Sequence, residues 1–459
     1  MADIASALRM PNPEHIGERL ITALEASLSP IAPLIADPKG DVCGMPADTR
    51  VKVVLGLIVD SGLTAVNSQV AAPLSSAPMD PQGDNAVASG KLIRRELVSM
   101  LHFGVCVHAD LPAQIVIMPN LLSLYDGGSG IDEAAKAVSE LSSLGWWQQH
   151  DFIPFAPWRC APRGAVPRKD GGVARSIVDQ GAPRNELRTR PEMEPVMSLN
   201  EACRLGRERD EVKPRFSDLA HNASILLHIA EQLDEPVFTV AFDFSKYFQQ
   251  LWFQGGELWR MGSLLPMADA SGHASELLSI HTELVMSMGL TPSSDIAQRL
   301  GNVLMQVFSH RLQAAERELG ISQTGVEQRW RAARAELPHD MLGSQSRMHD
   351  AMQYTDDPAF LIVGVQRTIL AITVWHEIIS GSGLLPAKQS KWQIGAGVHW
   401  LGGCCYPGLG IMWVPKDKAL RVRERIQTVL DGTCTPKSYT RRSWASLSTS
   451  STSPAFPAR

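Results

Sequence analysis

The run from Val237 to Phe244, VFTVAFDF, constrains the fold of this chain more than any other stretch. It is rich in β-branched and aromatic residues, and Phe238, Val240 and Phe242 alternate with positions that are themselves apolar or small. A strand with apolar residues on both faces must be covered on both sides. The sequence therefore predicts a strand buried on both faces, with Asp243 near its C-terminal end.

A second run, from Met352 to Gly364, has apolar residues on both sides of Tyr354-Thr355-Asp356-Asp357-Pro358. This layout is typical of a hairpin with two carboxylates at its tip. Neighbouring strands lie about 4.8 Å apart and project alternate side chains to one face. If the hairpin lies beside the first strand, Asp356 and Asp357 come close to Asp243.

Carboxylates on two such segments suit nucleotidyl transfer. That reaction uses two divalent ions about 3.5 to 4 Å apart, and Mg²⁺ prefers hard oxygen ligands. Asp243 and Asp356 fit the positions from which carboxylates would hold these ions. The alternative is a solvated hairpin tip, because Asp favours turns for local hydrogen-bonding reasons.

Charge and cysteine content narrow the class of protein. The net charge of the 459-residue chain is −5, and residues 1–150 carry 9 Lys and Arg against 16 Asp and Glu, so the acidity is N-terminal. Because binding to nucleic acid depends on a local basic face, this charge permits such a partner without establishing it. The seven cysteines form no C-x-x-C pair, so neither a disulfide framework nor a zinc site is predicted.

Targeting signals are not evident in the sequence. The apolar stretch Val51 to Leu63 is interrupted by Lys52 and Asp60 and is too short to cross a bilayer. Residues 1–30 lack the basic-then-apolar layout of a signal peptide. We expect an intracellular protein, cytoplasmic or nuclear, that is not secreted and has no membrane partner.

Periodicity and composition divide the chain into segments. Residues 1–149 are expected to be mainly helical and of unknown role, with a Pro-, Gly- and Ser-rich loop or linker at 71–90. A second domain is expected at 150–403, followed by a short unit at 404–442. The Ser-, Thr- and Pro-rich tail at 443–459 is expected to be disordered.

Four further helical segments follow from apolar spacing or charge pairing. Ile131–Leu144, Ile296–Leu312 and Ile369–Ile379 show helical periodicity, and the last is followed by glycines that would end it. Arg311–Arg334 continues as a strongly charged helical stretch.

Several stretches occur in one order along the second domain. They are Val166-Pro167-Arg168-Lys169-Asp170-Gly171 with Arg175, Val178-Asp179 and Asn185; Phe242-Asp243-Phe244-Ser245-Lys246-Tyr247-Phe248; Met288-Gly289-Leu290-Thr291-Pro292-Ser293-Ser294 with Gln298; Tyr354-Thr355-Asp356-Asp357; and Lys388-Gln389-Ser390-Lys391 before Trp400-Leu401-Gly402. From about Asp151 to Gly403 the sequence resembles the reverse transcriptases, or RNA-directed DNA polymerases, of retroelements. The Y-x-D-D box is the most specific of these matches.

The resemblance implies an α+β fold with the fingers and palm of a right-hand polymerase, in which an antiparallel palm sheet packs on helices. Residues 404–442 would be a partial thumb or connection. It also implies a nucleotidyltransferase that extends a DNA primer with deoxynucleotides on a nucleic-acid template. Two Mg²⁺ ions, for which Mn²⁺ can substitute, would be the cofactors.

The resemblance assigns roles at the triphosphate end of the site. Arg168, Lys169 and Arg175 would grip the triphosphate, for which ammonium groups and a guanidinium fork are suited. Phe248 would exclude a ribonucleotide 2′-hydroxyl, with Phe244 beside it. The alternatives are a solvated basic hairpin and core aromatic residues.

It also assigns the remaining site residues. Asp243, Asp356 and Asp357 would be the metal ligands, and Gln298 would support the incoming base. Either Lys388 or Lys391 would protonate the leaving pyrophosphate, and both could instead be surface lysines. The residues expected along the template and primer are Tyr354, Gly289, Ser293, Trp400, Leu401 and Gly402.

Departures from the family leave other functions open. The P-Q-G triplet is absent near Ser293, and the stretch from Arg311 to Ser344 looks like inserted material. The residues expected to be ordered after Gly403 are too few for a full thumb and a ribonuclease H domain, which favours a fragment or decayed copy. The alternatives are an RNA-directed RNA polymerase, which Phe248 disfavours, and an inactive palm that binds nucleic acid.

Overall fold

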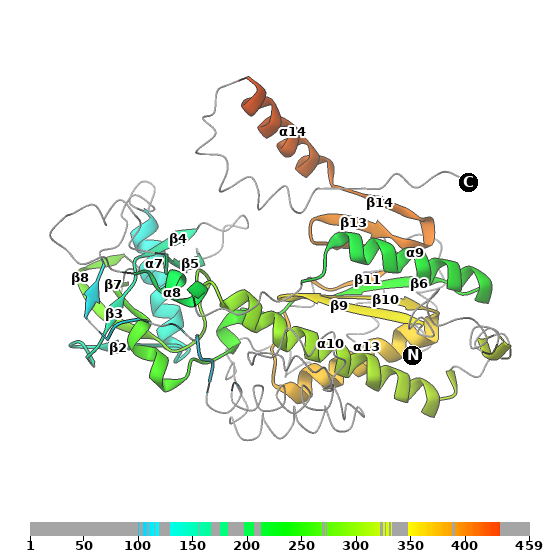
Figure 1. Cartoon of the computed structure of the whole chain (residues 1–459), viewed down its shortest axis with the longest axis horizontal. Coiled ribbons are helices and arrows are strands. Elements are labelled where there is room, and N and C mark those ends of the chain that lie inside the picture. Colours follow the sequence, from blue (N-terminus) through cyan, green and yellow to red (C-terminus); the bar gives the residue numbers. More distant parts are fainter. Residues whose placement is uncertain are drawn as a thin grey trace.

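The computed structural model describes residues 100, 104–107, 109, 111–113, 115–118, 129–154, 156–166, 175–181, 197–205, 213–268, 271, 273–321, 325, 327–329, 332, 348–387 and 391–431. Helices and several separate sheets are present, so the expected mixture of α and β structure is confirmed (Figure 1). Most of the expected helical region 1–149 lies outside the described residues, together with the 71–90 loop and the 443–459 tail.

A four-stranded antiparallel sheet forms the centre of the larger unit. Its order is β11-β6-β10-β9. The strands are β6 (Val237–Ala241), β9 (His349–Tyr354), β10 (Asp357–Val363) and β11 (Gln393–Gly395). The predicted strand and the predicted hairpin are therefore neighbours in one sheet.

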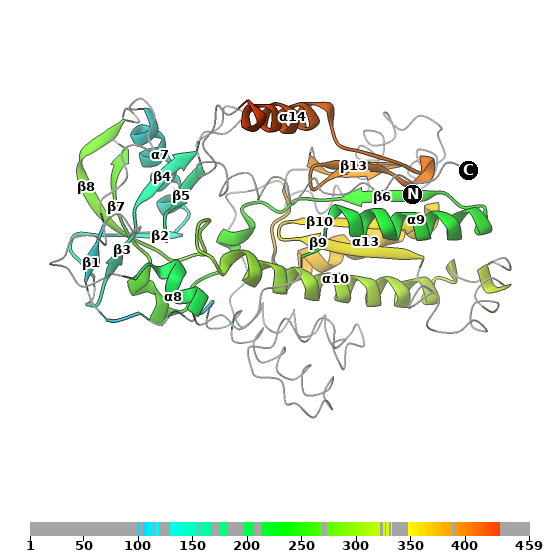
Figure 2. The same cartoon turned by 45° about the horizontal axis from the view of Figure 1, so that its top comes forward.

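Helices cover both faces of this sheet. The long helix α10 (Ser293–Glu318) and α13 (Val365–Ser382) lie on one side, and α9 (Phe216–Leu233) lies on the other (Figure 2). Helix α13 ends at Gly383, which is left-handed with φ 67° as helix-terminating glycines usually are.

The alternation predicted for the central strand directs its side chains into two cores. Phe238 and Val240 join the cluster with α10 and α13, whereas Val237 and Ala241 join the cluster with α9. All five residues of β6 are buried. Fully burying a Phe or Val side chain stabilises a fold by about 1.5 to 3 kcal/mol, so both contacts hold β6 in place.

Aromatic rings fill the core between the sheet and α13. Trp375 lies with its ring centroid 5.1 Å from that of Phe360 and 6.3 Å from that of Phe242. Because Phe242 directly precedes Asp243, this packing anchors the chain at the point where the candidate carboxylate emerges.

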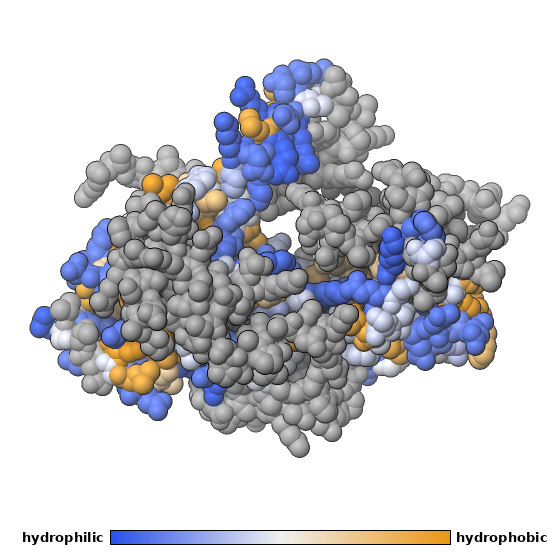
Figure 3. All heavy atoms as spheres, turned by 180° about the vertical axis from the view of Figure 1, so that it is seen from behind, coloured by the Kyte–Doolittle hydropathy of each residue, from blue (hydrophilic) through white to orange (hydrophobic). Residues whose placement is uncertain are grey.

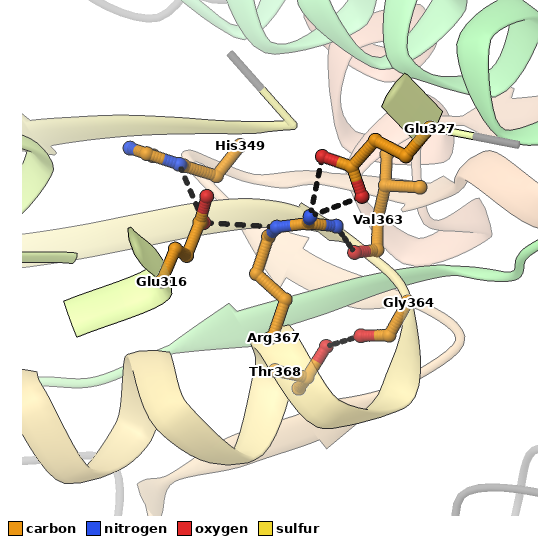
Figure 4. Close-up of polar contacts among 7 residues, drawn as sticks. All are labelled: Glu316, Glu327, His349, Val363, Gly364, Arg367 and Thr368. Atoms are coloured by element: carbon orange, nitrogen blue, oxygen red, sulfur yellow. Dashed lines mark hydrogen bonds and ion pairs between the residues drawn. The ribbon is translucent and has the colours of Figure 1, made fainter. Parts of the chain in front are cut away.

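A buried ion network closes the end of the sheet opposite the Tyr354–Asp357 turn (Figure 4). Arg367 Nε donates to Glu316 Oε1 at 2.8 Å, and Arg367 Nη2 lies 3.0 Å from Glu327 Oε2. Arg367 Nη1 also donates to the Val363 carbonyl at 2.6 Å, and His349 Nδ1 lies 3.7 Å from Glu316 Oε1. The network ties α10, β10 and α13 to Glu327 in the charged stretch.

A second unit contains a five-stranded sheet of order β1-β3-β7-β8-β2 and a separate hairpin, β4–β5. The strands are β1 (Val116–Ile117), β2 (Trp147–His150), β3 (Arg159–Cys160), β4 (Arg163–Val166), β5 (Arg175–Val178), β7 (Gly262–Ala268) and β8 (Ala274–Glu283). Helix α7 (Ser129–Ser143) confirms the predicted helix there and packs on β7, and α8 (Leu199–Leu205) lies near this unit (Figure 1).

The domain boundary expected at 149/150 falls inside β2. This strand pairs with β8 from Trp147↔Glu283 to His150↔Ile280. Residues on either side of the expected boundary therefore share one sheet.

A buried arginine holds this second unit together. Arg163 forms an ion pair with Glu283, and its Nε donates to Ser263 Oγ at 2.6 Å. Its guanidinium carbon lies 4.1 Å from the centre of the Trp147 ring. These contacts connect β4 with β8, β7 and β2.

The described C-terminal part begins with a three-stranded sheet, β12 (Val398–Trp400), β13 (Gly403–Tyr406) and β14 (Ile411–Trp413). Helix α14 (Lys416–Leu430) follows and projects from the body, and it is mostly hydrophilic in Figure 3. Three short 3₁₀ turns complete the described elements: η3 (Tyr247–Gln250), η4 (Gly255–Arg260) and η7 (Pro407–Leu409). No described helix combines the length and apolar character needed to cross a bilayer.

Candidate active site

The three predicted carboxylates lie at the neighbouring ends of two adjacent strands: Asp243 follows β6, Asp357 begins β10, and Asp356 directly precedes it. Ala241 of β6 pairs with Ala359 of β10, and beyond this pair the Phe242 N–H donates to the Pro358 carbonyl at 3.1 Å. The Phe244 N–H then donates to the Asp356 carbonyl at 3.2 Å. Continuation of this register places Asp243 directly opposite Asp357, on the sheet face that α9 covers farther along.

Asp356 lies in a two-residue turn between β9 and β10. Tyr354 pairs with Asp357 across the hairpin, and Thr355 adopts a left-handed backbone with φ 54°. A β-branched residue rarely adopts this conformation, so the surrounding structure must hold it.

Gln298 on α10 supplies that support. Its Oε1 accepts the Thr355 N–H at 2.8 Å, and its Nε2 donates to the Gln353 carbonyl at 2.6 Å. Gln353 Nε2 in turn donates to the Thr355 carbonyl at 2.6 Å. Gln298 is fully buried behind the turn, and these hydrogen bonds show that its side chain supports the turn.

The electrostatics of the turn follow from its crowded carboxylates. Burial and, after it, the negative charges of Asp356 and Asp243 together raise the pKa of Asp357 to about 7, whereas Lys391 opposes this shift. Deprotonation of Asp357 is therefore unfavourable unless a positive charge lies nearby.

Lys391 brings one such charge. Its Nζ lies 2.5 Å from Asp243 Oδ2, and the lysine side chain remains 60% exposed. Lys391, one of the two candidate lysines, is therefore placed against a carboxylate. Lys388 lies outside the described residues.

The aromatic residues after Asp243 occupy different positions. Phe244 is buried and stacks on Tyr247, with ring centroids 4.8 Å apart, so it lies in the core and could act on a nucleotide only indirectly. Phe248 in η3 is partly buried and packs against the same core. Phe248 is thus the aromatic residue of the expected pair with surface toward solvent.

The loop before α10 is fixed by a residue that sequence reasoning missed. Asn200 Nδ2 donates to the Gly289 carbonyl at 2.9 Å, and Asn200 Oδ1 accepts the Thr291 N–H at 2.7 Å. Gly289 has φ 108°, and a Cβ there would lie 2.0 Å from the Val178 carbonyl oxygen. Only glycine fits at position 289, where the loop lies against β5. No local sequence motif indicated the role of Asn200.

The other residues expected along template and primer lie around this framework. Ser293 is buried and its Oγ donates to the Ser287 carbonyl at 3.0 Å, and Tyr354 packs partly buried against the α9 cluster. Trp400 is buried and its Nε1 donates to the Asp357 carbonyl at 3.0 Å. The left-handed residues Leu401 (φ 46°) and Gly402 (φ 85°) follow, forming the turn between β12 and β13.

The expected triphosphate contacts are only partly described. Arg168 and Lys169 lie outside the described residues, between β4 and β5. Arg175 begins β5 and pairs with Val166, but the placement of its side chain is outside the description.

The donor chemistry of the turn suits a divalent cation, because carboxylate oxygens are the ligands that Mg²⁺ prefers. Such a cation would neutralise the negative charge that Asp243, Asp356 and Asp357 share. Within the described ranges, no group of three or more His, Cys, Asp or Glu side chains is arranged as a metal site.

Comparisons with known proteins give limited information. No family model matches the chain, and no curated protein matches it. Among solved structures, the native protease-reverse transcriptase of prototype foamy virus aligns with 12% identity and a TM-score of 0.35 over 67% of this chain and 28% of that chain. A foamy viral protease-reverse transcriptase in complex with double-stranded DNA aligns with 11% identity and a TM-score of 0.39, over 81% and 48% respectively.

These similarities define no family for the chain, because both TM-scores are below 0.5. The chain spans less than half the length of these proteins.

Proposed function

We propose that this chain is an RNA-directed DNA polymerase that extends a DNA primer with deoxynucleotides on a nucleic-acid template. The observation that carries the proposal is the register of β6 against β10, which sets Asp243 opposite Asp357 with Asp356 on the adjoining turn. A shared site of carboxylates from separate strands, rather than a lone solvated hairpin tip, is what nucleotidyl transfer requires.

The four-stranded sheet with α9, α10 and α13 would be the palm in this proposal. The five-stranded sheet and the β4–β5 hairpin would be the fingers. Arg168, Lys169 and Arg175 on that hairpin would face the triphosphate, and the three-stranded sheet with α14 would lie along the template and primer.

Asp243 and Asp356 would hold two Mg²⁺ or Mn²⁺ ions, with Asp357 assisting. When bound, these ions would promote deprotonation of the primer 3′-hydroxyl and neutralise the leaving pyrophosphate. The 3′ oxygen forms a bond to the α-phosphorus, while the bond between that phosphorus and its bridging oxygen breaks to release pyrophosphate.

The chain itself would contribute positioning and charge. Gln298 holds the turn that carries Asp356, so the carboxylate is oriented before substrate arrives. Phe248 would lie against the sugar and exclude a 2′-hydroxyl by steric conflict. Lys391 would stay near the phosphates as a source of positive charge.

Primer extension on an RNA template with Mg²⁺ tests the proposal. We expect the wild-type chain to incorporate deoxynucleotides, and Asp356→Asn to lower the rate by at least about 100-fold because a metal ligand is lost. Asp234→Asn is the matched control. Asp234 is exposed and left-handed at the end of α9, and Asn also tolerates that conformation.

The same assay separates the two alternatives. Preferential use of ribonucleotides by the wild-type chain would favour an RNA-directed RNA polymerase. No extension by folded wild-type protein would favour a palm that binds nucleic acid without catalysis. Phe248→Ala should increase ribonucleotide use if Phe248 selects the sugar.

A further inference from the structure

Lys391 is held beside Asp243 by the chain on both sides of it. On one side, Gln393 of β11 pairs with Ala241 of β6. On the other side, the Ala387 N–H donates to the Asp243 carbonyl at 2.7 Å. The backbone therefore brings Lys391 to the carboxylates through two anchor points, and its approach does not depend on the side chain alone.

The contact between these side chains is short but accessible. Lys391 Nζ lies 2.5 Å from Asp243 Oδ2, with the lysine side chain 60% and the aspartate side chain 22% exposed. A flexible lysine with this exposure can turn into solvent at little cost. Another cation can therefore replace the Lys391 ammonium group at the Asp243 carboxylate.

The charges around Asp243 give a reason for the contact. Asp357 is the neighbour of Asp243 across the strands, and Asp356 lies on the adjoining turn. Three carboxylates in one partly buried place repel one another. A cation on Asp243 lowers the repulsion.

We propose that Lys391 is an internal counter-ion that occupies Asp243 Oδ2 in the metal-free protein and is displaced when a divalent cation binds. This inference rests on the proposed function, because it concerns the same carboxylates. The exchange replaces the single positive charge of Lys391 with the two charges of the cation. The ion pair between Lys391 and Asp243 must break before the cation can bind the Asp243 carboxylate. Lys391 therefore lowers the metal affinity of the resting site and stabilises that site without metal.

Mn²⁺ titration of the full chain without nucleic acid tests the first consequence, with the unbound ion measured by electron paramagnetic resonance. We expect Lys391→Met to tighten Mn²⁺ binding roughly two- to fivefold, the range expected for loss of an exposed ion pair. Asp243→Asn should weaken binding in both the wild-type and the Lys391→Met background.

Lys246→Met is the matched control. Lys246 follows Asp243 by three residues, but its Nζ pairs with Glu140 Oε1 at 2.6 Å. Lys246→Met therefore removes a positive charge from the same region but leaves the ion pair between Lys391 and Asp243 in place. Binding should therefore change less in Lys246→Met than in Lys391→Met.

Thermal unfolding gives a second readout. In EDTA, Lys391→Met should unfold about 1 to 3 °C below the wild type, because the carboxylates lose their counter-ion. Saturating Mg²⁺ should remove that difference, since the bound ion takes over the same role.

The outcomes separate the two proposals. Asp243-dependent Mn²⁺ binding with equal affinity in the wild type and Lys391→Met would overturn the counter-ion role and leave the metal site standing. An equal gain in Lys246→Met would also overturn it, because a general charge effect would then suffice. No Asp243-dependent binding in any variant would overturn the metal site itself.

Discussion

Gln298 Oε1 accepts the backbone N–H of Thr355 at 2.8 Å, although the two residues are 57 positions apart in sequence. A residue of helix α10 therefore sets the conformation of the turn that carries Asp356. This hydrogen bond connects helix α10 to the turn of the candidate active site.

Replacing Gln298 should damage both stability and activity. Gln298→Leu leaves the Thr355 N–H and the Gln353 carbonyl without this partner in a buried place, where each unmade hydrogen bond costs about 1 to 3 kcal/mol. We expect a lower free energy of unfolding in denaturant, and slower primer extension even at temperatures where the variant is folded.

Gln306→Leu is the control for this change. Gln306 lies eight residues farther along the same helix and is only partly buried. Equal losses in the two variants would show that Gln298 has no special role in positioning the turn.

Removing Arg367 should be among the most destabilising single changes in the unit built on the four-stranded sheet. Arg367→Met leaves Glu316 and Glu327 buried without their cation, and breaking a buried ion pair in this way costs about 3 to 5 kcal/mol. Unfolding in urea should show a midpoint well below that of the wild type. Addition of Glu316→Gln and Glu327→Gln to the variant should recover part of the loss.

The exposed pair of Arg421 with Asp417 on α14, 2.6 Å apart, provides the comparison. Arg421→Met should change the free energy of unfolding much less than Arg367→Met does, because water screens an exposed pair. A similar effect at both arginines would contradict the buried network as a source of stability.

His281 should make the protein sensitive to mild acid. Burial and, after it, the positive charges of Arg163 and His150 together lower the pKa of His281 to about 4. The unfolded chain takes up a proton near the usual value of about 6.5, whereas the folded chain does so only near 4. Stability is therefore fully present above pH 6.5 and decreases as the pH falls toward 4, by an amount on the order of 3 kcal/mol.

Unfolding measured between pH 7 and pH 4 tests this dependence. His281→Gln should flatten the pH dependence in that window, whereas His221→Gln, at an exposed position on α9, should leave it unchanged. An unaltered slope in His281→Gln would assign the acid sensitivity to other groups.

Local sequence patterns were sufficient to predict the helices and strands whose apolar residues recur at regular spacing and pack into a core. The strand beginning at Val237, the hairpin at Tyr354–Asp357 and the helices near Ile131 and Ile369 all form where periodicity placed them. Such residues are spaced by the geometry of a single element, so a sequence window contains the information.

Contacts between distant segments were not predictable in the same way. Asn200, Gln298 and Lys391 act on residues about 60 to 150 positions away, and no local spacing reports such partners. Sequence did identify Gln298 and Lys391 as residues of interest, but their geometry shows support of a turn and pairing with Asp243. The buried position of Phe244 likewise depends on Tyr247 and Trp375 packing around it.

The alternation of β6 between two cores carries a consequence for how this protein can change in length. One residue inserted into β6 would exchange its faces, because side chains alternate with a period of two. Asp243 would then point toward the aromatic rings around Trp375, and Phe242 would take its place beside Asp357. Insertions or deletions of two residues would preserve the faces, so natural variation in this strand should favour even steps over odd ones.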